Sequence, residues 1–319
     1  MRIVYMGSPA VAVSPLEQLL LNGHQIAAVY TRPDKPAGRG REILATPVKK
    51  AATDWNLPVV QTASLKQPGA VTQLAAFKPE VVVVAAFGQI LPQAILDIPC
   101  YGCLNIHPSL LPEYRGASPV ISTILAGDDF AGVSVMRLDA GTDTGPVFAQ
   151  AQVPVLFNDT AESLTPRLFR VGAQMLLEVL AELPSGKILP VPQNDALASY
   201  TSEIAREAGK IDWQRPAEEI WRMIRAYQPW PEAYTFWKGQ QFTIKEAVPL
   251  PAVEGLSPGE VTILSQNLMG AAFGVGTGTG LLGVIKLQTA GKKAMSAADF
   301  LRGQRDFAGG LLGETQGCS

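Results

Sequence analysis

The chain has little of several features that would mark a special class of protein. It contains three cysteines in 319 residues, too few and too unevenly placed for the disulfide framework of a small secreted domain. No run of about 18 apolar residues predicts a membrane span, and the stretch 268–287 is interrupted by six glycines. Met1 leads directly into an apolar strand pattern without the hydrophobic region of a signal peptide. We therefore expect a cytoplasmic protein with no membrane partner.

The chain also lacks a strong overall charge. Its formal net charge is −2, so bulk electrostatics indicates no polyanionic partner. The segment from Arg32 to Lys50 differs, because six basic residues there oppose only two acidic ones. Such a local patch can contact phosphates even on a chain that is not basic as a whole. A solvated basic loop is the structural alternative.

The first half of the sequence alternates short apolar runs with helical patterns. This is typical of an α/β fold, a Rossmann-like and mostly parallel sheet with helices on both faces. The run Val81–Ala86 has no polar alternation, as expected for a central strand buried on both faces. We predict strands over Arg2–Met6, Gln25–Thr31, Pro58–Gln61, Val81–Phe87, Gly102–His107, Gly132–Leu138 and Val147–Val153.

Capping residues predict where helices begin. Ser14 followed by Pro15 is typical of an N-cap with proline at the first helical position, and Thr46 followed by Pro47 repeats the pattern. A longer helix is expected over 160–183.

The composition changes after that helix. Residues 184–206 contain prolines and small polar residues with little periodicity, which indicates an interdomain linker. We therefore expect a catalytic domain over 1–183 and a smaller domain over 207–319. The smaller domain begins with a helix pattern over 216–227 and is expected to form an OB-like β-barrel. Its predicted strands are Ala233–Trp237, Gln241–Ala247, Gly259–Leu264, Ala271–Val275 and Leu281–Leu287.

One histidine lies where chemistry is expected. His107 ends a predicted strand and is followed by Pro108, and the carboxyl ends of strands form the ligand crevice of open α/β sheets. Asn105 lies on the same side of that strand by alternation. An amide donor beside an imidazole is a suitable pair for stabilising an oxyanion. A strand-end histidine with a purely structural hydrogen bond is the alternative. His24, at a helix-to-strand turn, favours a structural role.

Two loops lie after predicted strands in this region. Residues 108–119 contain three prolines, and long structured loops in compact domains often carry function. The loop after Leu138 contains Asp139 and Asp143, and a carboxylate near His107 would orient the ring. An acidic turn without contact to His107 is the alternative.

Other chemistries have weaker signals. Cys100, Cys103 and His107 could offer three zinc ligands, but no fourth ligand has metal spacing, and cysteine is ordinary filler in a buried strand. Gly7-Ser8-Pro9 after the first strand lacks the other glycines of a dinucleotide fingerprint. We therefore expect neither a metal nor a nicotinamide cofactor.

Taken together, these motifs resemble a known family. The pair Asn105 and His107, the loop Ser109–Pro112 followed by Tyr114–Gly116, and Asp143–Gly145 are similar to the 10-formyltetrahydrofolate-dependent formyltransferases. Segments Thr31–Arg41 and Gly291–Gly303 resemble the basic loop and the C-terminal signature of the members that formylate methionyl initiator tRNA. The resemblance runs from Arg2 to about residue 303.

The resemblance implies an activity and its residues. The formyl group of 10-formyltetrahydrofolate would pass to the α-amine of methionyl initiator tRNA, leaving tetrahydrofolate. Asn105 would donate to the oxyanion, His107 would stabilise it and move the proton, and Asp143 would orient His107. The implied folate-binding residues are Phe87, Gln89, Ile90, Ser109, Leu110, Leu111, Pro112 and Asp139, and the implied tRNA-binding residues are Arg32, Lys35, Arg39 and Arg41.

Two other functional classes stay open from the sequence. One is a formyltransferase or hydrolase that acts on a small amine or on the folate itself. The other is an RNA-binding protein with a decayed enzyme fold, although an intact Asn105, His107 and Asp143 set argues against it. We expect a monomer.

Overall fold

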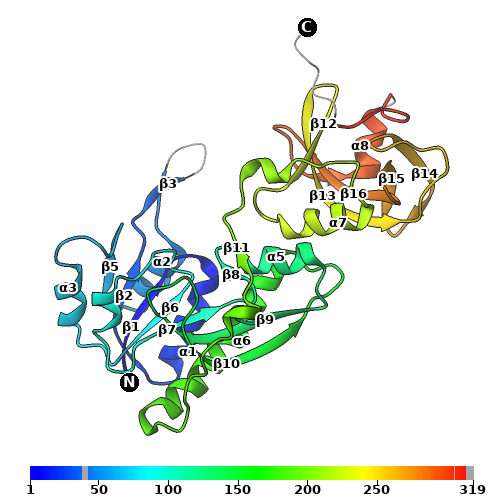
Figure 1. The fold of residues 1–319 in the computed structure, drawn as a ribbon. Coiled ribbons are helices and arrows are strands. Elements are labelled where there is room, and N and C mark those ends of the chain that lie inside the picture. The colour runs from blue at the N-terminus through cyan, green and yellow to red at the C-terminus, as the bar shows by residue number, and fades with distance from the viewer. Residues whose placement is uncertain (38–41, 305, 314–319) are drawn as a thin grey trace. The chain divides into compact units, whose positions relative to one another are not determined.

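The computed structural model describes residues 1–37, 42–304 and 306–313. The chain divides into two compact units (Figure 1). Unit 1 comprises Met1–Pro119, Phe130–Pro154 and Leu164–Ser202. Unit 2 comprises Val120–Asp129, Val155–Ser163 and Glu203–Ser319. Each unit contains its own sheet, and each is described separately below.

Unit 1 is built on one seven-stranded sheet in the order β10-β9-β7-β6-β1-β2-β5. Its strands are β1 (Arg2–Gly7), β2 (Gln25–Thr31), β5 (Val59–Gln61), β6 (Val81–Ala85), β7 (Cys103–His107), β9 (Phe130–Arg137) and β10 (Val147–Pro154). The five strands from β5 to β7 are parallel, whereas β9 and β10 form antiparallel ladders. The predicted Rossmann-like sheet is confirmed, and each predicted strand lies within two residues of its predicted ends.

The side chains of β1 show why helices cover both faces of this sheet. Val4 and Met6 belong to one apolar cluster with Leu74 and Ile95. Tyr5 lies between them in sequence and therefore points to the other face, where its buried hydroxyl donates to the carbonyl of Ala12. The two contacts join β1 to α3 and α4 on one face and to the start of α1 on the other. The helices of unit 1 are α1 (Val13–Leu21), α2 (Pro47–Asp54), α3 (Ala70–Ala76), α4 (Gln93–Leu96) and all but the first turn of α6 (Ala161–Glu182). Helix α5 (Pro119–Ala126) belongs to unit 2 except for its first residue.

The two predicted helix starts have different outcomes. Thr46 caps α2 as predicted, because its hydroxyl accepts the backbone N–H of Lys49 at 3.1 Å. The predicted cap at Ser14 is wrong. A 3₁₀ turn over Ala10–Ala12 leads directly into α1. The helix therefore begins at Val13, before Ser14, and has no side-chain cap.

Helix α6 confirms the predicted long helix and lies close to the sheet. A Cβ at Gly172 would be 2.5 Å from Cγ2 of Ile106 and 2.8 Å from Cγ2 of Val133. This glycine therefore lets the helix backbone approach β7 and β9. Within the described ranges no helix is both long and apolar enough to cross a membrane.

Two short strand pairs complete unit 1. Strands β3 (Lys35–Ala37) and β4 (Glu42–Leu44) form an antiparallel hairpin in the basic segment. Strand β8 (Arg115–Gly116) pairs in parallel with β11 (Tyr200–Thr201), and Figure 1 shows the two side by side. Residues Tyr200 and Thr201 belong to the segment that the sequence predicts as a linker.

Unit 2 contains an antiparallel sheet in the order β12-β13-β16-β15-β14, with β17 beside β16. Its strands are β12 (Ala233–Trp237), β13 (Gln240–Leu250), β14 (Val261–Leu268), β15 (Ala271–Gly276), β16 (Leu281–Thr289) and β17 (Met295–Ser296), and its main helices are α7 (Ala217–Ala226) and α8 (Ala297–Gly303). The predicted helix and all five predicted strands are confirmed.

The sheet of unit 2 does not close into a barrel through a continuous ladder, since no described pairing joins β14 to β12. Residues 309–313 bridge the two edges instead. The amide of Leu312 donates to Gly259 at 2.8 Å, just before β14, and the amide of Gly313 donates to Phe236 of β12 at 2.9 Å. Phe307, immediately before this segment, is fully buried and contacts the ring of Phe273 at 4.9 Å between centroids. The end of the described chain therefore covers both the open edges and the aromatic core.

Replacing Gly172 with alanine tests the close approach of α6. Alanine favours helix by up to about 1 kcal/mol, but overpacking against branched side chains costs about 1–3 kcal/mol. We expect Gly172→Ala to lower the stability of unit 1 by about 1–2 kcal/mol in urea unfolding. Gly303→Ala is the matched control because a Cβ there meets nothing within 4 Å. A stabilised Gly172→Ala protein would show that α6 does not lie this close to the sheet.

Candidate active site

The predicted strand-end pair lies at the carboxyl end of β7, between β6 and β9. Ile106 points toward Gly172 of α6, so strand alternation directs Asn105 and His107 to the opposite face. His107 is buried, with 4% of its surface exposed, and Asn105 is half-buried. The amide of Asn105 has no hydrogen-bond partner among the residues that the structure describes. A half-buried free amide beside a buried imidazole is available for a ligand.

Two loops hold the imidazole of His107. Its Nε2 lies 3.1 Å from the carbonyl oxygen of Tyr114, and its Nδ1 lies 3.6 Å from Oδ1 of Asp143. A carbonyl can only accept, so Nε2 must carry a hydrogen. The contact of Nδ1 has the length of an ion pair rather than of a hydrogen bond. The mobile proton of the ring is therefore the one on Nδ1, beside the carboxylate.

The carboxylate of Asp143 joins the two loops directly. Its Oδ2 accepts the backbone N–H of Gly116 at 2.9 Å. Both Asp143 and Tyr114 have φ near +55°, a left-handed conformation that is costly for residues other than glycine. The structure thus brings His107 and Asp143 together, as the resemblance to the family implies, and not as an acidic turn without contact to His107.

The loop after His107 is fixed by the neighbouring antiparallel strands. Ser134 of β9 donates its hydroxyl to Ser109 O at 2.6 Å and accepts the amide of Leu111 at 3.2 Å. Gln150 of β10 donates to Leu111 O at 2.8 Å. Leu110 lies against Gly132, because a Cβ added at Gly132 would be 2.2 Å from Cγ of Leu110. Sequence reasoning missed Ser134 and Gln150, because their role depends on the pairing of β9 with β7 and β10.

The other residues expected to bind folate have mixed surroundings. Phe87 is buried in the core, with 1% exposed. The amide of Gln89 is occupied, since it accepts from Leu65 N and donates to Thr62 O. Ile90 is 71% exposed, and Asp139 closes its own loop by accepting the hydroxyl of Thr144 at 2.7 Å. Pro112, in the loop after β7, accepts the amide of Ser199 through its carbonyl at 3.3 Å.

The base of the basic segment is well anchored. Lys49 donates to Asp34 at 2.5 Å, and this bond, with a second from Gln61, lowers the pKa of the Asp34 carboxyl. Arg32 donates to the carbonyl of Gly88, and Lys35 is exposed at the start of β3. Arg39 and Arg41, the other two predicted tRNA contacts, lie outside the described residues.

The two cysteines that the structure describes differ in burial. Cys103 is buried, and burial raises its pKa to about 12, so the sulfur is held as a thiol. Cys100 is exposed. Across residues 1–37, 42–304 and 306–313, no group of three or more His, Cys, Asp or Glu side chains is arranged to hold a metal.

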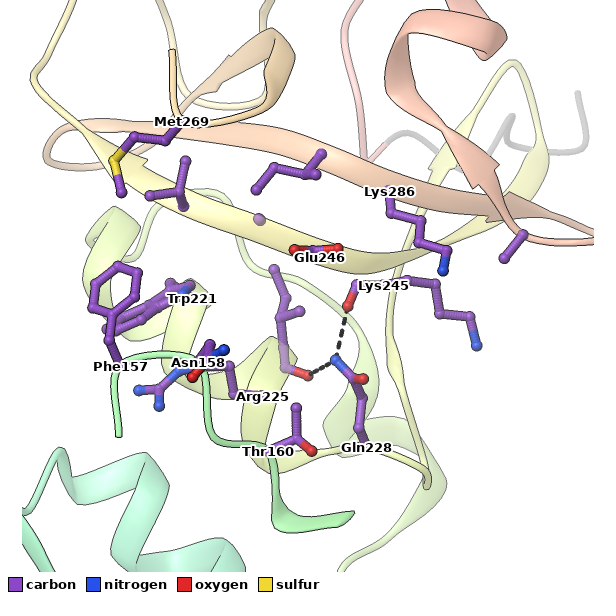
Figure 2. Close-up of a pocket in the computed structure, with 15 residues that line it drawn as sticks. Phe157, Asn158, Thr160, Trp221, Arg225, Gln228, Lys245, Glu246, Met269 and Lys286 are labelled. Carbon is purple, nitrogen blue, oxygen red and sulfur yellow. Dashed lines mark hydrogen bonds between the residues drawn. The ribbon is translucent and has the colours of Figure 1, made fainter. Parts of the chain in front are cut away.

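Unit 2 contains a separate cavity of about 600 Å³ between α7, β13 and residues 157–160 (Figure 2). The amide of Gln228 on its wall donates to the carbonyls of Ile224 and Lys245. The guanidinium of Arg225 lies 3.7 Å from the ring centre of Trp221, and burial lowers its pKa to about 10. None of the predicted catalytic residues lines this cavity, so we place the candidate active site at β7 in unit 1.

Known proteins resemble this chain over nearly its whole length. The sequence profile of the formyl transferase family matches residues 1–180, and that of the formyl transferase C-terminal domain matches residues 203–305. The methionyl-tRNA formyltransferase of Dehalococcoides mccartyi is 50% identical over 315 residues, 98% of this chain and 99% of that protein. The methionyl-tRNA formyltransferase of Chloroflexus aggregans is 46% identical over 303 residues, 95% of this chain and 97% of that protein.

Solved structures share the fold. HypX from Aquifex aeolicus, in complex with tetrahydrofolic acid, has a TM-score of 0.66 at 19% identity and covers 97% of this chain and 48% of its own. The methionyl-tRNA formyltransferase from Clostridium thermocellum has a TM-score of 0.57 at 17% identity and covers 80% of this chain and 95% of its own. At these identities the likeness shows the fold alone.

The tautomer of His107 tests the geometry of the site. The chain has only two histidines, so ¹⁵N-histidine labelling gives two ring systems, and a His24→Gln variant assigns them. At a pH where the ring is neutral, we expect the His107 signal of an Nε2-protonated tautomer, because Tyr114 O must accept. A neutral ring with its hydrogen on Nδ1 would contradict this arrangement.

Proposed function

This chain belongs to the formyl transferase family, and we propose that it transfers the formyl group of 10-formyltetrahydrofolate to the α-amine of methionyl initiator tRNA. The product would be N-formylmethionyl-tRNA for the initiation of translation. High identity to methionyl-tRNA formyltransferases along both units supports this substrate. The observation that carries the proposal is the arrangement at β7, where His107 is held between Tyr114 O and the carboxylate of Asp143, beside the free amide of Asn105.

Asn105 would act on the formyl oxygen. When the neutral α-amine attacks the formyl carbon, a C–N bond forms and negative charge develops on that oxygen. The side-chain N–H of Asn105 donates to this charge in a half-buried site, where a preorganised donor is worth more than in water. The substrate amine is itself the nucleophile, so the reaction requires no nucleophilic side chain.

His107 would move the proton. The attacking amine must lose a proton, and the folate nitrogen that bore the formyl group must gain one as its bond to carbon breaks. Because Nε2 is held by Tyr114 O, Nδ1 is the ring atom that can take and return this proton. The carboxylate of Asp143, 3.6 Å from Nδ1, faces the positive charge that the ring would carry between the two transfers. The same cation helps to neutralise the oxyanion.

The surroundings of β7 would hold the folate donor. The partly exposed Leu110 and Pro112 and the exposed Ile90 would offer apolar surface, whereas the main-chain groups of Ser109 and Leu111 are bonded within the protein. Phe87, Gln89 and Asp139 are engaged within the protein, so their part would be to shape the pocket. We also propose that the protein acts as a monomer in the cytoplasm, where charged tRNA enters translation.

The basic segment would contact the tRNA. Arg32 and Lys35 stand at the base of the β3–β4 hairpin, and Arg39 and Arg41 lie between its strands in sequence. The ion pair of Lys49 with Asp34 anchors that base. Phosphate contacts from such side chains fix the position of the nucleic acid and make binding depend on salt.

Variants at β7 test the chemistry. We expect Asn105→Ala to lower kcat for formylation of methionyl-tRNA by about 10²-fold or more, since one oxyanion donor contributes about 3 kcal/mol. His107→Ala should abolish turnover while tRNA affinity stays unchanged. The matched control is His24→Ala, which should keep wild-type turnover.

The same assay tests the substrate, with uncharged tRNA and free methionine as acceptors. Product from the charged tRNA alone would support the proposed function. Consumption of the formyl donor without tRNA product would contradict it and indicate a small amine or water as the acceptor.

A charge change in the basic segment tests tRNA recognition. We expect Arg39→Gln with Arg41→Gln to raise the KM for methionyl-tRNA and to reduce the slope of log KM against log salt by about 1 per lost phosphate contact. The matched control is Arg170→Gln with Lys187→Gln, which removes the same charge from exposed positions on and after α6. Equal KM values and salt slopes in both variants would show that the segment does not bind tRNA.

A further inference from the structure

The segment Val191–Thr201 crosses both loops that hold His107. Val191 exchanges two backbone hydrogen bonds of 2.8 Å with Val147, just after the Asp143 loop. Ser199 accepts the amide of Arg115 at 2.9 Å through its carbonyl and the amide of Tyr114 at 2.8 Å through its hydroxyl. We call Val191–Thr201 the strap. All of it lies in unit 1.

Gln193 is the one strap side chain that contacts both loops. Its Nε2 donates to the carbonyls of Asp143 at 2.8 Å and Gly145 at 2.7 Å. Its Oε1 accepts from Nε of Arg115 at 3.0 Å and from Nη2 at 2.8 Å. Carbonyls only accept and a guanidinium only donates, so the neighbours dictate which end of the amide faces which loop. Both hydrogens and both lone pairs of the amide are used.

Arg115 is itself a rigid partner. It is 1% exposed, and its Nη1 donates to Tyr200 Oη at 3.0 Å while its Nη2 pairs with Asp195 at 2.7 Å. Burial opposes its charge, but the bonds to Asp195 and Tyr200 outweigh that effect and raise the pKa of Arg115. Gln193 is therefore held by a fixed cation on one side and holds the Asp143 loop on the other.

The backbone of the Asp143 loop requires the hydrogen bonds that Gln193 donates to it. Its left-handed backbone at Asp143 is strained, and strain of this kind persists only where the surroundings over-determine it. The loop ends at Gly145, where a Cβ would lie 1.9 Å from the carbonyl of Arg137. We propose that Gln193 is a positioning residue for the transfer reaction, which ties the backbone of Asp143 to Arg115 and so keeps the carboxylate of Asp143 on His107.

This inference rests on the proposed function for its kinetic test. Gln193→Leu removes all four hydrogen bonds at similar size. Gln193→Glu keeps the acceptors for Arg115 but sets a carboxylate oxygen against two carbonyls. We expect both variants to lower kcat by about 10- to 100-fold, as a misplaced catalytic group does, with KM for methionyl-tRNA and for the folate donor within about twofold of wild type. Gln73→Leu, the same change on the exposed surface of α3, is the matched control.

A second measurement separates this inference from the proposed function. In ¹⁵N-histidine protein, Gln193→Leu should shift the Nδ1 signal of His107 and leave His24 unchanged, whatever the substrate is. If the wild-type protein transfers no formyl group, the proposed function is refuted. The ¹⁵N spectrum of His107 still tests the positioning role of Gln193 in that case. Wild-type kcat in a folded Gln193→Leu protein, or an unchanged His107 spectrum, would overturn the positioning role.

Discussion

The hydrogen bond from His107 Nε2 to the carbonyl of Tyr114 is the constraint on which the site depends. It fixes the ring in one orientation and assigns one nitrogen a permanent hydrogen, so only Nδ1 is left for proton transfer. Nδ1 in turn faces Asp143. A buried imidazolium without a neighbouring carboxylate would be costly. The carboxylate of Asp143 also accepts the backbone N–H of Gly116, and this hydrogen bond holds it beside the ring of His107. The proposed proton transfer thus depends on the position of one backbone carbonyl.

The switch from parallel to antiparallel strands makes this arrangement possible. Because β9 runs antiparallel to β7, the chain leaves β9 beside the start of β7 and turns back through the Asp143 loop into β10. The same strands supply Ser134 and Gln150, which hold the loop after His107. A wholly parallel sheet would require a helical crossover at this point. The two antiparallel strands therefore serve as a frame for both catalytic loops.

Local chemistry in the sequence was enough to predict the strands, the long helix, the Thr46 cap and the strand-end position of His107. Local sequence patterns did not predict the contacts that depend on strand pairing between residues far apart in the chain. Nothing near Asp143 in sequence indicates that its backbone turns left-handed, and Gln193 follows Pro190 and Pro192 in a segment that has the composition of a linker. Its role arises from the register of β8 with β11, which no local pattern encodes. The misplaced cap at Ser14 has a local cause instead, because the 3₁₀ turn over Ala10–Ala12 starts the helical backbone before Ser14.

The extent of chain that the site requires follows from these contacts. All three proposed catalytic residues precede α6, and the sheet that carries them is complete at Pro154. Left-handed backbone at Tyr114 and Asp143 costs about 1–3 kcal/mol at each residue, and the bonds that offset this cost come from Gln193, Ser199 and their neighbours. A chain that ended with α6 would keep the catalytic side chains but would release the backbone that aims two of them. The proposed active site therefore depends on the chain as far as Thr201, because the strap bonds to both loops although it contributes no reacting group.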